Sequence, residues 1–522
     1  MRDHLLLFIN GQRHEVSGRA TFVSLSDYLR LHCGLIGTKI VCSEGDCGAC
    51  TTLVGRPDFA RGEFHYVPID SCIQFLFQLD GTHVVTVEGL RRDGTLNSVQ
   101  QAMVDCHGSQ CGFCTPGFVM AMTGLLEEQE TVDENELRTG LTGNLCRCTG
   151  YTPILEAGMK SNDAEHERLN ELYPAAPLLA EFETLRNEPL ALAAEWFGES
   201  HVAACPTTLA GALEFLAQHP TATIVAGATD IGVRINKSGR IPPAILDLNR
   251  IAELDHVGVG NEEITVGARA TWTDILIAIA NAPRVASRGK DHRLRPILSD
   301  LAEVNGHEVP EQAAPRRHRQ DGLGEFARVI ATFGARQIRN VGTIAGNIVN
   351  ASPIADSLPF LYVMDAFIVI AGKDDMRVIN INDFYHGYKQ TDLKPGELVM
   401  GVRIPRPKHD DLLRLYKVSR RRDLDISGFT AAVRMQLEGD AITQASIAFG
   451  AVGPTVLRAK QTERFLVGEP LTLETMQTAG DIAVSEVTPI DDVRGSAEYR
   501  RQLTRNVLLK FYHQTQGHLA PA

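Results

Sequence analysis

The sequence predicts a multidomain protein of the α+β class, in which two small cysteine-bearing domains precede two larger mixed domains. Three observations support this prediction. The chain has 522 residues, too many for a single hydrophobic core. Two compact sets of cysteines lie in its first third, in a chain with 11 cysteines in all. The hydrophobic pattern alternates at first, becomes helical from Thr95, and turns mixed after Thr207.

Composition and charge exclude several function classes. Apolar residues make up 44% of the chain and charged residues 22%, which is ordinary for a globular protein. The net charge of −13 argues against nucleic acid or an anionic membrane as a partner. The apolar run Leu5–Ile9 is too short for a signal peptide or a membrane span. Because cysteines kept as thiolates fit a reducing compartment, we expect a cytoplasmic protein.

The first domain is predicted over residues 1–90. It combines short runs of β type with a brief helical segment at Ser26–Leu31 and a glycine-rich loop at 42–50. The predicted strands are Leu5–Ile9, Gln12–Val16, Glu63–Val67 and His83–Val87. Strands around a short helix with a cysteine loop are typical of a ferredoxin-like β-grasp domain.

The first cysteine set has the spacing of plant-type ferredoxins. Cys42, Cys47 and Cys50 read C-x4-C-x2-C, and Cys72 follows. In ferredoxins four such thiolates hold one 2Fe–2S cluster. Zinc sites commonly pair two C-x2-C motifs instead, so the spacing favours iron and leaves zinc as the alternative. The small residues of the loop would let backbone N–H groups approach the sulfurs.

The second set lies in a domain predicted to be all helical, over residues 91–165. Its cysteines are Cys111, Cys114, Cys146 and Cys148, which read C-x2-C and C-x-C. The pairs Thr115-Pro116 and Thr152-Pro153 predict helix N-termini just after the two motifs, where partial positive charge favours a thiolate cluster. Zinc is again the alternative, but the neighbouring first set favours a second 2Fe–2S cluster. The other three cysteines, Cys33, Cys106 and Cys205, are predicted to be small buried residues without a role.

The remaining chain is predicted to hold a linker and two mixed domains. Prolines between 166 and 197 predict a surface linker. A basic, aperiodic stretch at 285–320 predicts an exposed insertion loop. The predicted organisation is therefore 1–90, 91–165, a linker at 166–197, a mixed domain at 198–410 and a C-terminal α/β domain at 411–522.

Two glycine-containing turns in the 198–410 domain suggest a nucleotide cofactor. One turn includes Gly227, and the other includes Gly342 and Gly346. Neither has the G-x-G-x-x-G pattern of a dinucleotide-binding Rossmann fold, and each alone is more consistent with a structural turn than with a cofactor site. Together they suit a nest of N–H groups around a pyrophosphate. Because one-electron clusters need a partner that exchanges one or two electrons, the cofactor is predicted to be a flavin.

These motifs, in this order, resemble the molybdenum hydroxylase family. The resemblance is carried by Cys-Ser-Glu-Gly-Asp-Cys-Gly-Ala-Cys at 42–50, Gln-Cys-Gly-Phe-Cys-Thr-Pro-Gly at 110–117, Gly-Asn-Leu-Cys-Arg-Cys-Thr-Gly-Tyr at 143–151, Val-Ala-Gly-Ala-Thr-Asp at 225–230 and Arg-Asn-Val-Gly-Thr-Ile-Ala-Gly-Asn-Ile at 339–348. It covers nearly the whole chain. The sequence departs from the family pattern at Ala228 and Ala345, where the family usually has glycine.

The resemblance implies two 2Fe–2S clusters and an FAD-binding domain of the vanillyl-alcohol-oxidase/CO-dehydrogenase-flavoprotein type at 198–410. It implies that no residue of this chain catalyses the oxidation of the substrate. It also implies that Phe333 lies beside the flavin ring. The implied contacts to the FAD pyrophosphate are Ile224, Val225, Ala226, Gly227, Ala228, Thr229, Asp230 and Ile231. The remaining implied contacts are Phe333, Thr343, Ile344, Ala345, Gly346, Asn347, Asp356, Val399 and Lys417.

The resemblance also implies a partner and a reaction. The 411–522 region is too short for a molybdopterin domain, so that cofactor is expected on a large partner subunit, in a heterotetramer of two small and two large chains. Electrons would pass from a purine, hypoxanthine or xanthine on its way to urate, through both clusters to FAD and on to NAD. The alternatives are the same role in an aldehyde or N-heterocycle hydroxylase and, in a different class, a zinc-stabilised binding protein.

Overall fold

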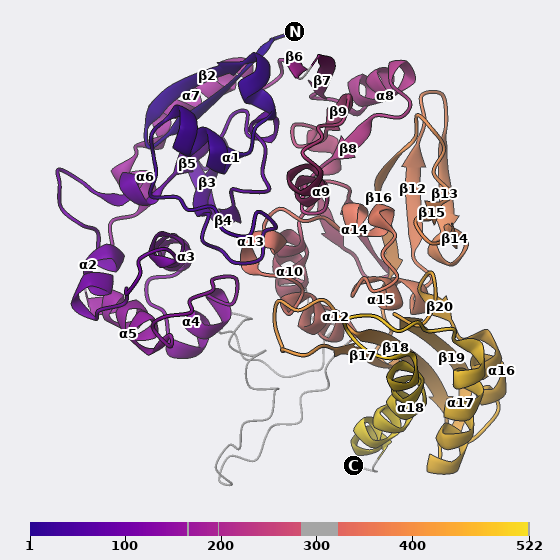
Figure 1. Cartoon of the computed structure of the whole chain (residues 1–522). Helices are drawn as coiled ribbons and strands as arrows, with labels where there is room; N and C mark the ends of the chain where they lie inside the picture. The colour runs from indigo at the N-terminus through magenta and orange to yellow at the C-terminus, as the bar shows by residue number, and fades with distance from the viewer. Residues whose placement is uncertain (164–165, 197, 283–321, 520–522) are drawn as a thin grey trace. The chain divides into compact units, whose positions relative to one another are not determined.

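A computed structural model describes residues 1–163, 166–196, 198–282 and 322–519 (Figure 1). The predicted insertion loop at 285–320 lies outside these residues. The described chain divides into two compact units. The first holds residues 1–254 and 335–342, and the second holds 255–282, 322–334 and 343–519. The FAD-binding region predicted at 198–410 contributes to both units, so its boundaries stay a prediction.

The first unit begins with the predicted ferredoxin-like sheet. Its strand order is β2-β1-β5-β3-β4, with β1 and β5 parallel and the other neighbours antiparallel. The strands are β1 His4–Ile9, β2 Gln12–Ser17, β3 Thr51–Asp58, β4 Glu63–Asp70 and β5 His83–Val85, and the short helix is α1 Leu25–Asp27, continued by a π turn at Tyr28–His32. The apolar run of β1 is buried on both faces, which explains why it lacks alternation.

The helical region follows as predicted. Its helices are α2 Ser98–Asp105, α3 Thr115–Leu126, α4 Glu134–Gly140 and α5 Thr152–Lys160. Met103, Phe118 and Leu137 belong to their shared buried core. Cys114 is the N-cap of α3, so one cysteine of the second set does lie at a helix N-terminus.

The segment predicted as a linker is folded, and that prediction is wrong. It forms α6 Leu169–Leu172, α7 Ala175–Leu185 and β6 Leu190–Trp196. Phe182 of α7 is buried and meets Phe8 edge-on at 5.4 Å between ring centroids. The prolines do not prevent this, because Pro174 is the N-cap of α7 and Pro177 lies in its first turn, where no intrahelical N–H donor is lost.

A second sheet completes the first unit, with strand order β6-β7-β9-β8. Strands β7 and β9, and β9 and β8, run parallel. Its other elements are β7 Glu199–Cys205, α8 Leu209–Gln218, β8 Thr223–Val225, α9 Ile231–Ser238, β9 Ala244–Asp247 and, from later in the chain, α13 Arg336–Arg339. The turn predicted to hold a pyrophosphate therefore lies at the carboxyl end of β8, where α/β sheets commonly bind ligands.

The second unit contains a five-stranded sheet of order β10-β11-β16-β12-β13 and a four-stranded antiparallel sheet of order β17-β18-β19-β20. In Figure 1 the yellow helices α16, α17 and α18 lie along the four-stranded sheet, and Phe429, Phe449 and Phe511 are buried in their shared core.

The strands of this unit are β10 Val257–Val259, β11 Glu263–Gly267, β12 Phe367–Ala371, β13 Met376–Asn380, β14 Tyr385–Gly387, β15 Gln390–Thr391, β16 Leu398–Pro405, β17 Leu412–Val418, β18 Phe429–Glu438, β19 Ala441–Gly450 and β20 Leu457–Arg458. Its helices are α10 Trp272–Asn281, α12 Gly322–Ala331, α14 Ile344–Asn350, α15 Leu358–Val363, α16 Lys460–Leu466, α17 Leu473–Glu486 and α18 Ala497–Leu519. No described helix has both the length and the apolar character needed to cross a bilayer.

His83 makes the stability of the first unit depend on pH. The ring is fully buried, Gly11 N–H donates to its Nε2 at 3.1 Å, and its Nδ1 lies 2.6 Å from the Tyr66 hydroxyl. Burial lowers the pKa of His83 to about 4 from 6.5. As the pH falls, His83 takes up a proton at a higher pH in the unfolded chain than in the folded one. The contribution of neutral His83 to the free energy of unfolding is therefore fully present above pH 6.5 and is lost as the pH falls toward 4.

We expect the titration of His83 to change the free energy of unfolding by about 3 kcal/mol over this pH range, since one pKa unit corresponds to ~1.4 kcal/mol. Urea unfolding at several pH values should show a shallower loss of stability in His83→Gln than in the unaltered protein. Parallel pH profiles for the two proteins would contradict this expectation.

Candidate iron–sulfur and flavin sites

The four thiols of the first cysteine set gather in the first unit. Cys42, Cys47 and Cys50 come from the loop before β3, and Cys72 follows β4. The Cys42 sulfur accepts hydrogen bonds from Cys47 and Cys72, which lowers the pKa of Cys42. Cys72 also contacts Cys50, and its pKa is raised by these thiol contacts. The predicted grouping of these four residues is thus present in the fold.

The loop around Cys42 presents backbone N–H groups to sulfur. The N–H groups of Glu44 and Asp46 lie 3.4 and 3.5 Å from the Cys42 sulfur. Ser43 and Gly45 adopt left-handed backbone conformations, with φ of 56° and 71°. These two turns direct the N–H groups inward, as predicted from the small residues of the loop. N–H donors stabilise a negatively charged cluster and affect its reduction potential.

The second set gathers in two pairs. The Cys148 thiol donates to the Cys111 sulfur at 3.4 Å, and the Cys114 thiol contacts Cys146. Burial, followed by the contact with Cys146, raises the pKa of Cys114 to about 12. Cys111 and Cys148 are exposed, whereas Cys146 is buried. One side of the second set therefore faces solvent on this chain.

Both sets suit a two-iron cluster. In a 2Fe–2S centre each iron is bound by two of the four thiolates. The four sulfurs therefore surround two metal positions, two sulfurs to each, and do not converge on one ion. Cys111 with Cys148 and Cys114 with Cys146 are such pairs. In the first set the four sulfurs form a connected group, in which Cys42 contacts Cys47 and Cys72, and Cys72 also contacts Cys50. Within the ranges that the structure describes, no three His, Cys, Asp or Glu side chains are arranged to hold a single metal ion.

The other three cysteines are not among the predicted ligands. Cys205 is fully buried, as predicted for a small core residue. Cys33 and Cys106 are only partly buried, at the edges of two hydrophobic cores.

The two cysteine loops are hydrogen-bonded to each other. The N–H of Leu145, directly before Cys146, donates to the carbonyl of Cys47 at 3.0 Å. The buried Asn144 side chain donates to the carbonyl of Gly48 at 3.0 Å and accepts from Gln337 Nε2 at 2.9 Å. A single hydrogen bond thus joins Cys47 of the first set to the residue that directly precedes Cys146 of the second set. Neither Asn144 nor Gln337 was predicted as a site residue, because such long-range contacts leave no local pattern.

The predicted pyrophosphate turn between β8 and α9 approaches the second glycine motif closely. A Cβ atom at Gly227 would overlap the carbonyl oxygen of Val341, so only glycine fits there. Ala228 adopts a left-handed conformation with φ of 55°, which explains why the family usually has glycine at this position. The first unit therefore brings Gly227 against Val341 and Gly342, as the two motifs suggested.

Three side-chain amides hold the carbonyls of this turn. Gln74 Nε2 donates to the Gly227 carbonyl at 2.8 Å, and Gln78 and Asn249 both donate to the Ala226 carbonyl at 3.0 Å. In a trans peptide the next N–H points the opposite way. Among the described residues, the N–H groups of Gly227 and Ala228 donate to no protein acceptor. Free, oriented N–H groups before a helix suit a phosphate group.

In the second unit, Asp356 and Lys417 form a buried ion pair. Lys417 Nζ lies 2.7 Å from Asp356 Oδ2 and also donates to the Thr332 carbonyl at 2.9 Å. Ser427 donates to the other Asp356 oxygen at 2.5 Å. The Asp356 carboxylate is thus occupied by side chains of its own unit, and its contact with FAD stays a prediction. Ser427 was not predicted as a site residue.

Two of the other predicted flavin residues of this unit, Asn347 and Phe333, adjoin the same network through Ser357 and Thr332. Thr343 is the N-cap of α14, the helix that carries Ile344–Asn347. The Asn347 side chain accepts a hydrogen bond from Ser357, next to Asp356, at 2.7 Å. Phe333, next to Thr332, packs against Trp272 with ring centroids 5.3 Å apart. Val399 is buried in β16, and its role stays a prediction.

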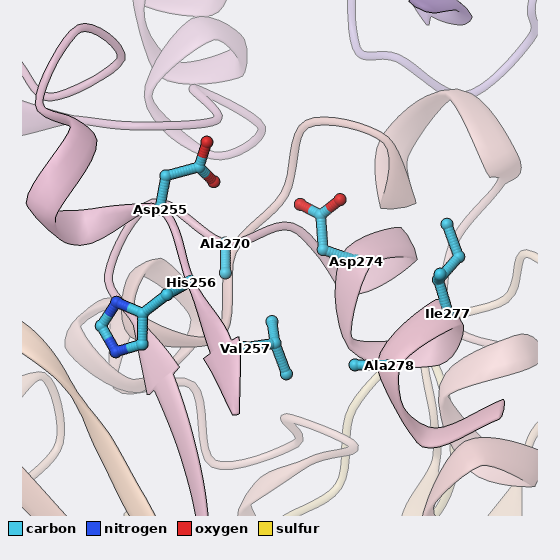
Figure 2. A pocket seen from close by; sticks show the side chains of 7 residues that line it. All are labelled: Asp255, His256, Val257, Ala270, Asp274, Ile277 and Ala278. Carbon is cyan, nitrogen blue, oxygen red and sulfur yellow. The ribbon is translucent and has the colours of Figure 1, made fainter. Parts of the chain in front are cut away.

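A separate pocket lies between the start of β10 and α10 (Figure 2). Its volume is about 280 Å³, and it is lined by Asp255, His256, Val257, Ala270, Asp274, Ile277 and Ala278. Both carboxylates already have structural partners. Asp255 pairs with Arg269 at 2.9 Å, and Asp274 accepts from the N–H of Thr271 at 2.8 Å as it caps α10. None of the predicted site residues lines this pocket.

Comparison with known families identifies three domains. Residues 86–159 match the [2Fe-2S] binding domain, 197–407 match the FAD binding domain in molybdopterin dehydrogenase, and 414–515 match the CO dehydrogenase flavoprotein C-terminal domain. The predicted fold classes of these regions are confirmed. The predicted boundaries and the individual cofactor contacts stay predictions.

The chain is also similar to known proteins over nearly its whole length. The chain is 30% identical to xanthine dehydrogenase of Drosophila subobscura, over 99% of this chain and 40% of that protein. It is 28% identical to aldehyde oxidase 2 of Cavia porcellus, over 98% of this chain and 40% of that protein. The chain thus spans about 40% of the length of these relatives. A chain of quinoline 2-oxidoreductase from Pseudomonas putida 86 superposes with a TM-score of 0.48 at 23% identity, over 60% of this chain and 97% of that chain.

The three domains define an iron–sulfur flavoprotein. With the alignments along nearly the whole chain, they support the resemblance to the molybdenum hydroxylase family that its motifs suggested.

Proposed function

We propose that this chain is the electron-transfer part of a xanthine dehydrogenase. It receives electrons from a molybdopterin-binding partner and passes them through two 2Fe–2S clusters to FAD and then to NAD, while the partner oxidises hypoxanthine or xanthine to urate. The observation that carries the proposal is the pair of four-cysteine sets joined by the hydrogen bond from Leu145 to Cys47.

The exposure of the two sets supports this direction of electron flow. Cys111 and Cys148 are exposed, so the second set is accessible to a partner. The first set is more buried, and α9, which follows the proposed phosphate turn, packs beside it. Electrons entering at the second set would therefore reach the first set before the flavin. A bound flavin supplies the change from one-electron to two-electron chemistry that NAD requires.

The residues of this chain bind and orient the cofactors. The N–H groups of Gly227 and Ala228 would hold the FAD pyrophosphate. The N–H groups of Glu44 and Asp46 would stabilise the cluster bound at Cys42. The buried Asp356 holds Lys417 in a fixed position in the second unit.

Metal analysis tests the proposal most directly. Because eight thiolates make two 2Fe–2S sites, we expect about four irons and about four acid-labile sulfides per chain, with negligible zinc. Visible absorbance should show a brown protein with flavin bands. Stoichiometric zinc in a colourless protein would support the zinc-stabilised binding protein instead.

The same role in an aldehyde or N-heterocycle hydroxylase is the second candidate, favoured by the 28% identity to aldehyde oxidase 2. The purified complex separates the two candidates by its relative turnover of xanthine, an aldehyde and an N-heterocycle. Identification of the chains that co-purify with this one tests the proposed molybdopterin-binding partner and the two-plus-two stoichiometry.

A further inference from the structure

Asn236, in the last turn of α9, is bonded to the loop of the first cysteine set. Its side-chain Nδ2 donates to the carbonyl of Ser43 at 3.0 Å and to the carbonyl of Cys72 at 2.8 Å. All three residues lie in the first unit. Cys72 is a predicted cluster ligand, and Ser43 directly follows another, Cys42. One amide group therefore bonds the segments that carry Cys42 and Cys72 to the same helix, although these segments are far apart in sequence.

The Ser43 carbonyl belongs to the same peptide group as the N–H of Glu44. That N–H lies 3.4 Å from the Cys42 sulfur. Because the peptide is trans, its C=O and N–H point in opposite directions, so an amide that holds the carbonyl also aims the N–H at the sulfur. Ser43 has φ of 56°, an unfavourable conformation for a residue other than glycine. The hydrogen bond from Asn236 helps to keep this peptide in place.

The approach of α9 to this loop is close. A Cβ at Gly232 would lie 2.5 Å from the carbonyl oxygen of Ile73, so glycine is needed where the helix passes the chain after Cys72. Val233 of α9 and Ile338 of α13 pack on Cys50, Cys72 and Ile73. The same helix begins at Ile231, the last residue of the proposed phosphate turn. Helix α9 is therefore a short, rigid connection between that turn and the cluster loop.

On the basis of the proposed function, we infer that Asn236 is a positioning residue for the first cluster. Its amide fixes the Ser43–Glu44 peptide, and the N–H of Glu44 then donates to the Cys42 thiolate. A donor to a ligand sulfur stabilises the reduced cluster, which carries the extra negative charge. Loss of the amide frees the peptide, weakens this hydrogen bond and lowers the reduction potential of the first cluster, while the second cluster is unaffected.

The test is a redox titration of the purified full-length protein followed by electron paramagnetic resonance, which resolves the two reduced clusters. In Asn236→Leu, which has a similar size and no donor, we expect about a tenfold lower reduced-to-oxidised ratio of the first cluster at a fixed potential. For a one-electron couple this corresponds to a shift of about 59 mV. Amide hydrogen exchange at Glu44 should be faster in this variant.

Two further variants serve as controls. Asn236→Gln keeps the amide and should retain a potential closer to that of the unaltered protein. Ser238→Ala lies on the same helix and removes a hydroxyl whose one hydrogen bond among the described residues comes from the N–H of Arg240, so it should not shift either cluster. If Asn236→Leu loses its iron, the potential cannot be read in that variant and Asn236→Gln becomes the test. Normal iron content and a normal potential in Asn236→Gln support the role of the amide. The same loss of iron in Asn236→Gln overturns the inference.

An unchanged potential in Asn236→Leu, or equal shifts of both clusters, would also overturn the inference. Failure of the proposed function is distinguishable from these outcomes, because the unaltered protein would then show no pair of iron–sulfur signals at all.

Discussion

Gly227→Val should yield a protein that keeps its iron and loses its FAD. The added Cβ would overlap the Val341 carbonyl oxygen and would lie 2.9 Å from Gly342 Cα, so one backbone segment must move. Movement of the turn misplaces the N–H groups of Gly227 and Ala228. Hydrogen bonds to charged groups contribute about 1.5–3 kcal/mol each. Because ~1.4 kcal/mol is tenfold in affinity, the loss of two such bonds weakens FAD binding by about 100-fold or more.

The measurement is the ratio of FAD to iron in the purified protein. Gly211→Ala is the matched control, because α8 belongs to the same unit and a Cβ at Gly211 would meet only Pro206 Cβ at 3.3 Å and Thr208 Oγ1 at 3.4 Å. That variant should keep both cofactors. An unchanged ratio in Gly227→Val would show that the turn has only a structural role.

Local patterns in the sequence were sufficient for much of the fold. The apolar run of β1 and the helical stripe that includes Phe118 depend on neighbours in the chain, and both elements form where the pattern indicated. The cysteine spacing was equally informative, because ligands on one loop must match the geometry of the group that they bind. The close contact between Gly227 and Val341 also agrees with the two glycine motifs.

The errors and omissions concern residues whose partners are distant in sequence. Proline content alone made 166–197 look like a linker, although Leu178 and Phe182 form the apolar side of a helix that packs on the first sheet. The amides that organise the site, Asn144 and Asn236 among them, bond to backbone carbonyls up to 193 residues away. Backbone carbonyls occur at every position, so no sequence pattern indicates which of them an amide will reach.

Asn144 is the second position where we expect a large effect. The side chain is 5% exposed, and it donates to the Gly48 carbonyl at 3.0 Å and to Thr51 Oγ1 at 3.3 Å. It also accepts from Gln337 Nε2 at 2.9 Å. In Asn144→Leu each of these three groups loses one hydrogen bond and keeps another, because the Gly48 carbonyl also accepts from Thr51 and Gln337 Nε2 also donates to Thr51 Oγ1. At about 0.5–1.5 kcal/mol for each lost bond the total is about 1.5–4.5 kcal/mol. That is a large fraction of the ~5–15 kcal/mol stability of a typical protein.

The loss should fall on the contact between the two cysteine loops. Asn144 directly precedes Leu145, whose N–H donates to Cys47, so movement of this segment separates the loops that carry Cys47 and Cys146. We therefore expect Asn144→Leu to lower the thermal unfolding temperature and to contain less than about half of the iron of the unaltered protein.

Asn162→Leu is the appropriate control for this effect. Asn162 also makes two hydrogen bonds to backbone, at 3.0 and 2.8 Å, but both join Val132 in the helical region and neither involves a cysteine loop. This variant should lose stability and keep its iron. Equal iron in the two variants would show that Asn144 contributes to stability alone, whereas selective loss of iron in Asn144→Leu would show that the contact between the loops is needed to hold the clusters.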